Sequence, residues 1–212
     1  MNLRFPEFDA AFGKLPLVAI LRGVTPDEVE GIAAALYEEG FRLIEVPLNS
    51  PAALDSITRL VRCLPADAVV GAGTVMSRAD VEAVQQTGAR LIVMPHADTK
   101  VIASAKLAEV ICIPGAATPT EVFAALRAGA DAVKIFPAEL VSPAALKAMR
   151  AVMAKEIRLL PVGGITPERM SDYTRAGASG FGLGSALYAP GMTAETVRER
   201  ARQFVEVLKT LH

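Results

Sequence analysis

Short apolar stretches, rich in Val, Ile and Leu, recur along the chain, and amphipathic segments separate them. They predict eight strands, at residues 17–21, 42–46, 68–72, 90–94, 109–113, 131–135, 158–162 and 179–183. Successive strands begin 19 to 27 residues apart, which leaves room for one helix and two short loops per unit. Strands that alternate with helices predict right-handed βαβ crossovers and a parallel sheet.

Eight such units in 212 residues predict a minimal (β/α)8 TIM barrel. No linker, charge run or low-complexity segment divides the chain, so residues 1–212 are predicted to form one domain. The opening segment EFDAAF predicts a short helix that closes one end of the barrel. The alternative is a doubly wound open sheet, but its G-x-G-x-x-G sequence after the first strand is absent.

Ser or Thr followed by Pro marks five predicted helix starts. A hydroxyl can accept from a free backbone N–H there, and Pro at the first helical position has no N–H to leave unpaired. Thr118 with Glu121, and Ser77 with Asp80, also resemble capping boxes. The five pairs are Thr25-Pro26, Ser50-Pro51, Thr118-Pro119, Ser142-Pro143 and Thr166-Pro167.

An internal repeat gives the register of alternate strands. Each repeat has a glycine between a helix end and a strand, where a left-handed C-cap is expected; these are Gly40, Gly88, Gly129 and Gly177. The residues five positions later are Glu45, Val93, Lys134 and Gly182. Four side chains from alternate strands form one interior layer of a barrel. Glu45 and Lys134 are therefore predicted to face each other near the C-terminal ends of their strands.

A lysine in a buried strand has a specific chemical use. Desolvation disfavours the ammonium and lowers the lysine pKa, which produces a neutral amine that can attack a ketone and form an iminium. Glu45 is the acid predicted in the same layer, and it could move protons to and from the reacting atoms. The alternative is structural: a Lys134–Glu45 ion pair that fills the barrel, or a lysine whose amine reaches solvent at one rim.

Two glycine-rich loops indicate a phosphate site. The sequence VGGITPERM follows the seventh predicted strand, and GLGSALY follows the eighth. Glycines let backbone N–H groups approach an anion, and the loops after strands 7 and 8 are the usual phosphate site of this fold. The sequence therefore predicts a phosphorylated substrate.

Composition excludes several classes. The chain is 52% hydrophobic with a net charge of −1 and has no basic stripe, so no nucleic-acid partner is expected. No apolar run approaches the roughly 18 residues of a membrane span, and the opening residues do not resemble a secretory signal. Cys63 and Cys112 are expected to be buried free thiols of a cytoplasmic protein, and the alternative is a disulfide between them. His96 and His212 form no metal-ligand pattern with the cysteines, so no metal is expected.

These motifs resemble the 2-keto-3-deoxy-6-phosphogluconate and 2-keto-3-deoxy-6-phosphogalactonate aldolases, a family of lysine-dependent class I aldolases. The similarity runs from LPLVAILRG to GLGSALY. The motifs appear in the family's order and are IEVPLNS, GAGT, MPH, KIFPAE, PVGGIT and GLGS. The resemblance implies cleavage of a six-carbon keto-acid phosphate into pyruvate and glyceraldehyde 3-phosphate, without a cofactor, by a homotrimer.

The resemblance also implies residue roles. Lys134 would form the Schiff base, and Glu45 would be the general acid and base. The implied substrate-binding residues are Arg22, Thr74, Pro95, Phe136, Val162, Gly163, Gly164, Gly184 and Ser185. Among them, Thr74 would hold the carboxylate of the pyruvate half and Phe136 would pack beside the imine. The glycines with Ser185 would bind the phosphate.

Three positions bear on the branch of the family. Val162 stands where the gluconate branch usually has Thr, whose hydroxyl can bond the C4 hydroxyl of the sugar acid, and Val is characteristic of the galactonate branch. Asn49 stands where the gluconate branch usually has Arg, so Arg22 is expected to supply the cation, unless it is only a solvated arginine of the rim. The expected activity is that of a phosphogalactonate aldolase. The alternatives are a phosphogluconate or hydroxyglutarate aldolase, another phosphate-binding barrel enzyme such as an isomerase, and a catalytically silent sugar-phosphate-binding barrel.

Overall fold

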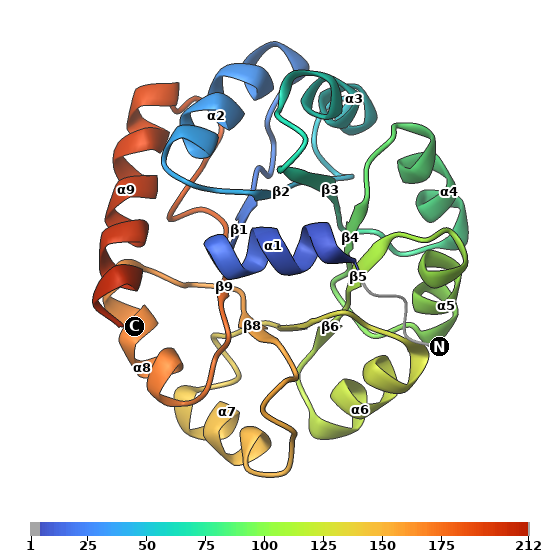
Figure 1. Cartoon of the computed structure of the whole chain (residues 1–212), viewed down its shortest axis with the longest axis vertical. Helices are drawn as coiled ribbons and strands as arrows, with labels where there is room; N and C mark the ends of the chain where they lie inside the picture. The colour runs from blue at the N-terminus through green and yellow to red at the C-terminus, as the bar shows by residue number, and fades with distance from the viewer. Residues whose placement is uncertain (1–4, 212) are drawn as a thin grey trace.

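The computed structural model describes residues 5–211, in which short parallel strands alternate with helices (Figure 1). The strands are β1 (Leu17–Ile20), β2 (Leu43–Pro47), β3 (Val69–Gly73), β4 (Leu91–Val93), β5 (Ile111–Ile113), β6 (Gly115–Ala116), β7 (Val133–Ile135), β8 (Leu159–Pro161) and β9 (Phe181–Leu183). The helices are α1 (Pro6–Lys14), α2 (Pro26–Glu38), α3 (Ala53–Cys63), α4 (Arg78–Gln86), α5 (Thr99–Leu107), α6 (Pro119–Ala128), α7 (Pro143–Arg150), α8 (Pro167–Arg175) and α9 (Ala194–Thr210). The predicted α/β alternation is confirmed, and each of the eight predicted strands overlaps an observed one.

The strands form two parallel sheets. One has the order β5-β4-β3-β2-β1-β9, and the other has the order β6-β7-β8. Only Pro114 separates β5 from β6, and proline has no N–H to donate to a ladder. The predicted strand at 109–113 is therefore followed by a further short strand, β6, which was not predicted. A single bridge between Val162 and Gly182 joins the chain after β8 to β9.

Helix α1 covers the end at which the strands begin. Its residues Phe8, Ala11 and Phe12 are buried and pack with Val18 and Leu43, which point toward the inside of the curled sheet. Figure 1 shows α1 across the centre of the strands, with the other helices around them. Full burial of each phenylalanine contributes about 1.5–3 kcal/mol. The predicted closing helix is confirmed, and an active site must lie at the other end of the strands.

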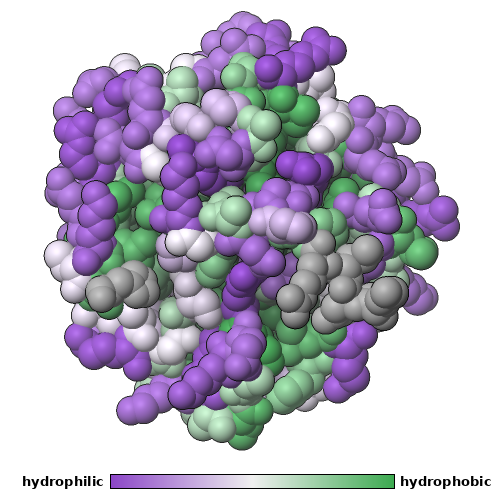
Figure 2. Space-filling model, viewed as in Figure 1, coloured by the Kyte–Doolittle hydropathy of each residue, from purple (hydrophilic) through white to green (hydrophobic). Residues whose placement is uncertain are grey.

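A second apolar cluster fills the space between the strands and the surrounding helices. It contains side chains that alternate along the strands with the inward ones, such as Ala19 and Leu21 against Ile44 and Val46. On the face that carries α1, hydrophilic side chains cover most of the rim, and apolar side chains are visible between the helices (Figure 2). Within residues 5–211, none of the helices has the length and apolar character needed to cross a bilayer.

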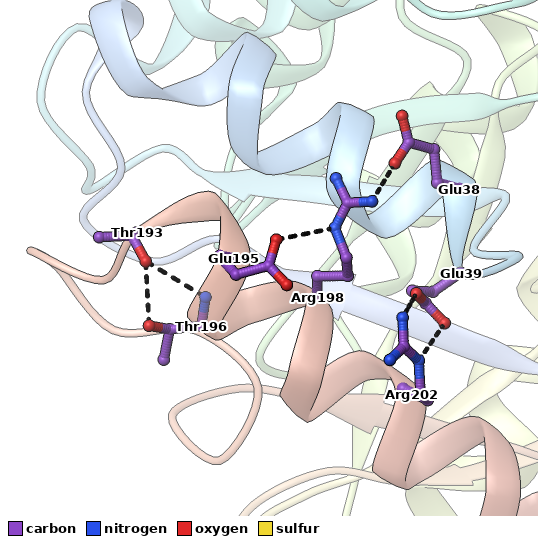
Figure 3. Close-up of polar contacts among 7 residues, drawn as sticks. All are labelled: Glu38, Glu39, Thr193, Glu195, Thr196, Arg198 and Arg202. Carbon is purple, nitrogen blue, oxygen red and sulfur yellow. Dashed lines mark hydrogen bonds and ion pairs between the residues drawn. The ribbon is translucent and has the colours of Figure 1, made fainter.

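The first and last of the surrounding helices are joined by ion pairs. Arg202 Nη2 of α9 lies 2.8 Å from Glu39 Oε1, and Arg198 pairs with Glu38 at the end of α2 (Figure 3). Thr193 caps α9 by accepting from the N–H of Thr196 at 3.2 Å. These contacts hold the C-terminal helix against α2, so elements from the two ends of the sequence are neighbours in space.

Four of the five predicted Ser/Thr-Pro caps are helix N-caps, namely Thr25, Thr118, Ser142 and Thr166. Both predicted capping boxes, at Ser77 and Thr118, are also present. The prediction for Ser50 is wrong. Helix α3 begins three residues later, at Ala53, and Ser50 Oγ instead accepts from the N–H of Gly23 at 2.9 Å.

The four glycines of the repeat have the predicted positive φ, between 82° and 105°. Cys63 and Cys112 are free, but Cys63 is exposed rather than buried.

Candidate active site

Lys134 and Glu45 both lie inside the curled sheet, on β7 and β2. They are among the few buried charged side chains of the described chain, with exposed fractions of 7% for Lys134 and 2% for Glu45. Each changes the pKa of the other through its charge. Of the other two residues in the predicted layer, Val93 packs in the inner apolar cluster. A Cβ at Gly182 would lie 2.6 Å from Val162 Cγ2, so Gly182 also faces inward.

The carboxyl group of Glu45 is buried. Its Oε2 atom is buried without a hydrogen-bond partner in the described part of the chain. Burial raises the pKa of Glu45 from 4.5 to about 7, although the charges of Lys134 and Arg22 oppose this shift. A carboxyl group with a pKa near neutrality can both accept and donate a proton at physiological pH.

Gly73 makes room for this carboxylate. A Cβ at Gly73 would overlap the Glu45 carboxyl group, so any larger residue at this position would displace it. Gly73 is the third residue of the GAGT motif, and no role was predicted for it. Its role depends on where the Glu45 side chain points, which no local pattern shows.

The amine of Lys134 is also largely desolvated. Burial lowers its pKa from the ordinary lysine value, and the positive charge of Arg22 lowers it further, while the negative charge of Glu45 raises it. The Nζ atom lies 4.3 Å from the centre of the Phe136 ring. Lys134 and Glu45 are thus close enough for the charge of each to shift the pKa of the other.

Arg22 is held at the mouth of the site by the loop after β2. Its Nη1 donates to Asn49 Oδ1 at 2.7 Å, and the neighbouring Gly23 N–H donates to Ser50 Oγ at 2.9 Å. Two adjacent hydrogen bonds therefore connect the loop after β1 to the loop after β2. The guanidinium is exposed and affects the pKa of both Glu45 and Lys134, so it is available to an anionic ligand.

A cavity of about 370 Å³ extends from Lys134 to the glycine-rich loops. Its size suits a small metabolite. Ile20, Arg22, Phe136 and Val162 surround the end near the lysine. The remaining lining residues are Glu139, Gly163, Gly164, Ile165, Thr166, Gly184, Ser185 and Ala186. The structure therefore brings together Lys134, Arg22, Phe136, Val162 and all the residues predicted to bind phosphate.

The loop after β8 has the backbone form of an anion site. Gly163 and Gly164 have φ angles of 112° and 57°, which side-chain-bearing residues rarely adopt. The loop leads into α8, whose N-cap Thr166 makes no side-chain capping bond. Free N–H groups and the positive end of the helix dipole favour an anion at this place. Gly184, after β9, has open space where a Cβ would be.

Thr74 and Pro95 lie outside the cavity wall. They follow β3 and β4, at the same end of the strands as the lysine, and both are half-buried. Thr74 has a φ of 58°, an unfavourable backbone conformation for a β-branched residue. Such strain is often found at functional sites and is consistent with a role for Thr74.

His96, beside Pro95, is exposed. Among residues 5–211, no group of three or more His, Cys, Asp and Glu side chains is arranged to hold a metal ion.

Comparison with known proteins identifies the family. The family model described as KDPG and KHG aldolase matches residues 8–202. A protein from Rhizobium meliloti named probable 2-dehydro-3-deoxy-6-phosphogalactonate aldolase is 46% identical over 88% of each chain. The 2-dehydro-3-deoxy-6-phosphogalactonate aldolase of Escherichia coli is 43% identical over 92% of this chain and 96% of its own.

A solved structure described as native KDPGal superimposes with a TM-score of 0.92 and is 40% identical, covering 100% of this chain and 98% of that chain. The likeness extends over the whole fold and includes the strands that carry Lys134 and Glu45. The chain belongs to the KDPG and KHG aldolase family of carbon–carbon lyases.

Proposed function

We propose that this protein is a 2-dehydro-3-deoxy-6-phosphogalactonate aldolase, which releases pyruvate and D-glyceraldehyde 3-phosphate. One observation carries the proposal: a buried lysine, close to a buried carboxyl group, lines a cavity that extends to a glycine loop with the backbone form of an anion site. The names of the relatives at 43% and 46% identity support the same substrate.

The reaction begins with nucleophilic attack by Lys134. The neutral amine attacks the C2 ketone, and loss of water from the resulting carbinolamine gives an iminium. Glu45 accepts the proton of the C4 hydroxyl while the C3–C4 bond breaks, and the bonding electrons move into an enamine. The aldehyde phosphate leaves, Glu45 returns its proton to C3, and water releases pyruvate and the free lysine. A pKa of about 7 suits Glu45 to both directions of transfer.

The remaining cavity residues orient the substrate. Arg22 attracts the C1 carboxylate, with Thr74 and Pro95 nearby at the ends of their strands, and Phe136 packs beside the imine. Gly163, Gly164, Gly184 and Ser185 receive the phosphate. The mechanism uses only side chains of the protein, and the family resemblance implies no metal or organic cofactor.

Val162 supports the galactonate epimer. It lines the cavity and is nearly fully buried, and its side chain offers no hydrogen bond to a substrate hydroxyl. A threonine at this position could bond the C4 hydroxyl, and a site without such a partner discriminates less strongly. The alternative, a phosphogluconate or hydroxyglutarate aldolase with the same chemistry, is separated by comparing kcat/KM for the two C4 epimers.

Borohydride reduction in the presence of pyruvate tests the chemistry directly. Reduction of the iminium should attach the pyruvate carbons covalently to the peptide that contains Lys134, as measured by mass spectrometry. Lys106, which pairs with Asp131 at 2.8 Å, provides an internal control that should remain unmodified. An unmodified Lys134 peptide would leave a catalytically silent sugar-phosphate-binding barrel as the better account.

We also propose that the two sheets are parts of one closed (β/α)8 barrel. Two observations support it: Pro114 is the single residue between β5 and β6, and the Val162–Gly182 bridge joins β8 to β9.

A homotrimer, implied by the family resemblance, is supported by five exposed apolar side chains: Leu54, Met76, Leu107, Leu140 and Val152. A solved chain 42% identical comes from a cage designed by fusing symmetric oligomeric domains. The two free thiols favour a cytoplasmic location.

A further inference from the structure

A carboxylate lies within the end of the cavity that the proposed function assigns to phosphate. Glu139 lines this end together with Gly163, Gly164 and Ser185. A Cβ at Gly163 would overlap Oε2 of Glu139, and a Cβ at Gly164 would lie 3.2 Å from Oε1. The two glycines therefore leave the space that the carboxylate occupies, and Glu139 is in contact with the loop proposed to bind an anion.

Glu139 forms no close ion pair. In the described part of the chain no hydrogen bond or salt bridge joins its carboxylate to another side chain, although the Arg169 guanidinium is near: Nη1 would lie 2.8 Å from the same Cβ at Gly164. That nitrogen donates to the carbonyl oxygen of Gly164 at 2.6 Å, and so it supports the loop rather than Glu139.

Two anions cannot share this site without a cost. A phosphate monoester carries a charge of about −1.5 to −2 at neutral pH, and an ionised carboxylate within about 6 Å repels it even in a medium as polar as water. The Glu139 side chain is exposed and can turn away, but its charge stays close to the bound phosphate.

We propose that Glu139 determines how tightly this aldolase holds phosphate: its carboxylate opposes the charge of the phosphate and weakens binding of the phosphorylated substrate and product. The inference rests on the proposed function. Arg22 and the glycine loops attract the two ends of the substrate, and Glu139 limits the attraction at one end. The expected benefit is faster release of glyceraldehyde 3-phosphate and weaker inhibition by inorganic phosphate.

The test uses two variants, Glu139→Gln and Glu139→Ala. Glutamine keeps the size and shape of the side chain but removes its charge. Its amide could donate a hydrogen bond to phosphate and tighten binding by itself, and alanine, which has no such donor, excludes that explanation. The inhibition constant of inorganic phosphate against substrate cleavage is measured at constant ionic strength. We expect it to fall about three- to tenfold in both variants, with a parallel fall in KM for the phosphorylated substrate.

A matched control removes the same charge elsewhere. Glu206 is exposed in the last turns of α9, which returns along the outside of the sheet to the end opposite the cavity. Glu206→Gln should leave the inhibition constant unchanged. Borohydride trapping of pyruvate, which carries no phosphate, should be equal in the parent and in both Glu139 variants.

Two results would overturn the inference. One is an inhibition constant that is unchanged or higher in both Glu139 variants. The other is a higher KM for the sugar phosphate with unchanged phosphate inhibition, which would mean that Glu139 binds a substrate hydroxyl. Failure of the proposed function would give a different result, because the parent protein would then trap no pyruvate. The effect of Glu139 could still be tested in that case, since calorimetry measures the phosphate affinity of the parent and of each variant without any turnover.

Discussion

Lys134 and Glu45 place a base and an acid inside an otherwise apolar interior. Each alone would be a costly buried charge, and burial shifts both pKa values toward the neutral forms. The mutual attraction of the charged forms opposes these shifts. The balance leaves the pKa of Glu45 at about 7 and the pKa of Lys134 below the ordinary lysine value. Both shifts favour the proposed Schiff-base chemistry over a purely structural ion pair.

Replacement of Lys134 should separate catalysis from stability. We expect Lys134→Ala and Lys134→Met to abolish turnover and borohydride trapping, because no other amine lies in the cavity wall. Both variants should fold, since removal of the amine raises the pKa of Glu45 further and leaves a neutral acid. Steady-state cleavage and urea unfolding measure the two effects. Turnover near the parent rate would refute the nucleophile assignment.

Val162→Thr should move the epimer preference toward the gluconate substrate. The new hydroxyl gains a hydrogen bond with only one C4 epimer, so we expect the ratio of the two kcat/KM values to change by roughly three- to tenfold. The matched control is Val152→Thr, at an exposed residue outside the cavity. An unchanged ratio would remove residue 162 from the account of specificity.

At the scale of helices and strands, local patterns predicted most of the fold. Strand positions, N-caps such as Thr118 and the left-handed glycines depend on neighbouring residues, so the sequence shows them directly. The inward direction of Lys134 and Glu45 followed from the repeat, because side chains alternate along a strand.

Features that depend on distant contacts could not be predicted. The Ser50 hydroxyl is taken by the N–H of Gly23 from another loop, which no capping pattern shows. Gly73 matters only because the Glu45 side chain turns toward it, and Glu139 only because it contacts Gly163. Pro114 was visible in the sequence, but the interruption between β5 and β6 depends on the register of the neighbouring strands.

The capping box of α6 should contribute measurably to stability. Glu121 N–H donates to Thr118 Oγ1 at 3.3 Å, and the Glu121 carboxylate accepts from the Ala117 and Thr118 N–H groups at 2.9 Å. We expect Thr118→Ala to lower the free energy of unfolding by about 1 kcal/mol. Thr118→Ser should restore most of the loss, and the neighbouring Thr120→Ala serves as a control without a cap. Equal stability of all three variants in urea would contradict this role.

For the whole molecule, the pKa of Glu45 links stability to pH. The group titrates near 4.5 when unfolded and near 7 when folded, so between these values the folded state binds more protons. The free energy of unfolding should therefore fall as the pH rises from 4.5 through 7, by on the order of 3 kcal/mol.

Glu45→Gln lacks this titration and provides the comparison. Its stability should stay level or rise over the same interval, because Lys134 without its partner prefers the neutral amine even more. Chemical unfolding at several pH values measures both proteins. Parallel pH profiles would mean that Glu45 is hydrated and ordinary in the folded protein.

The single bridge between Val162 and Gly182 makes the junction of β8 and β9 the most sparsely bonded place between neighbouring strands. The glycine loops that we assign to phosphate emerge from these same two strands. An occupied site would therefore connect two segments that the backbone joins only by this bridge and by the Ser179 N–H, which donates to the Leu159 carbonyl oxygen at 2.9 Å. Amide hydrogen exchange should slow most at residues 159–164 and 181–185 when a phosphorylated ligand binds, because the bound ligand adds contacts between β8 and β9 that the sheet itself lacks.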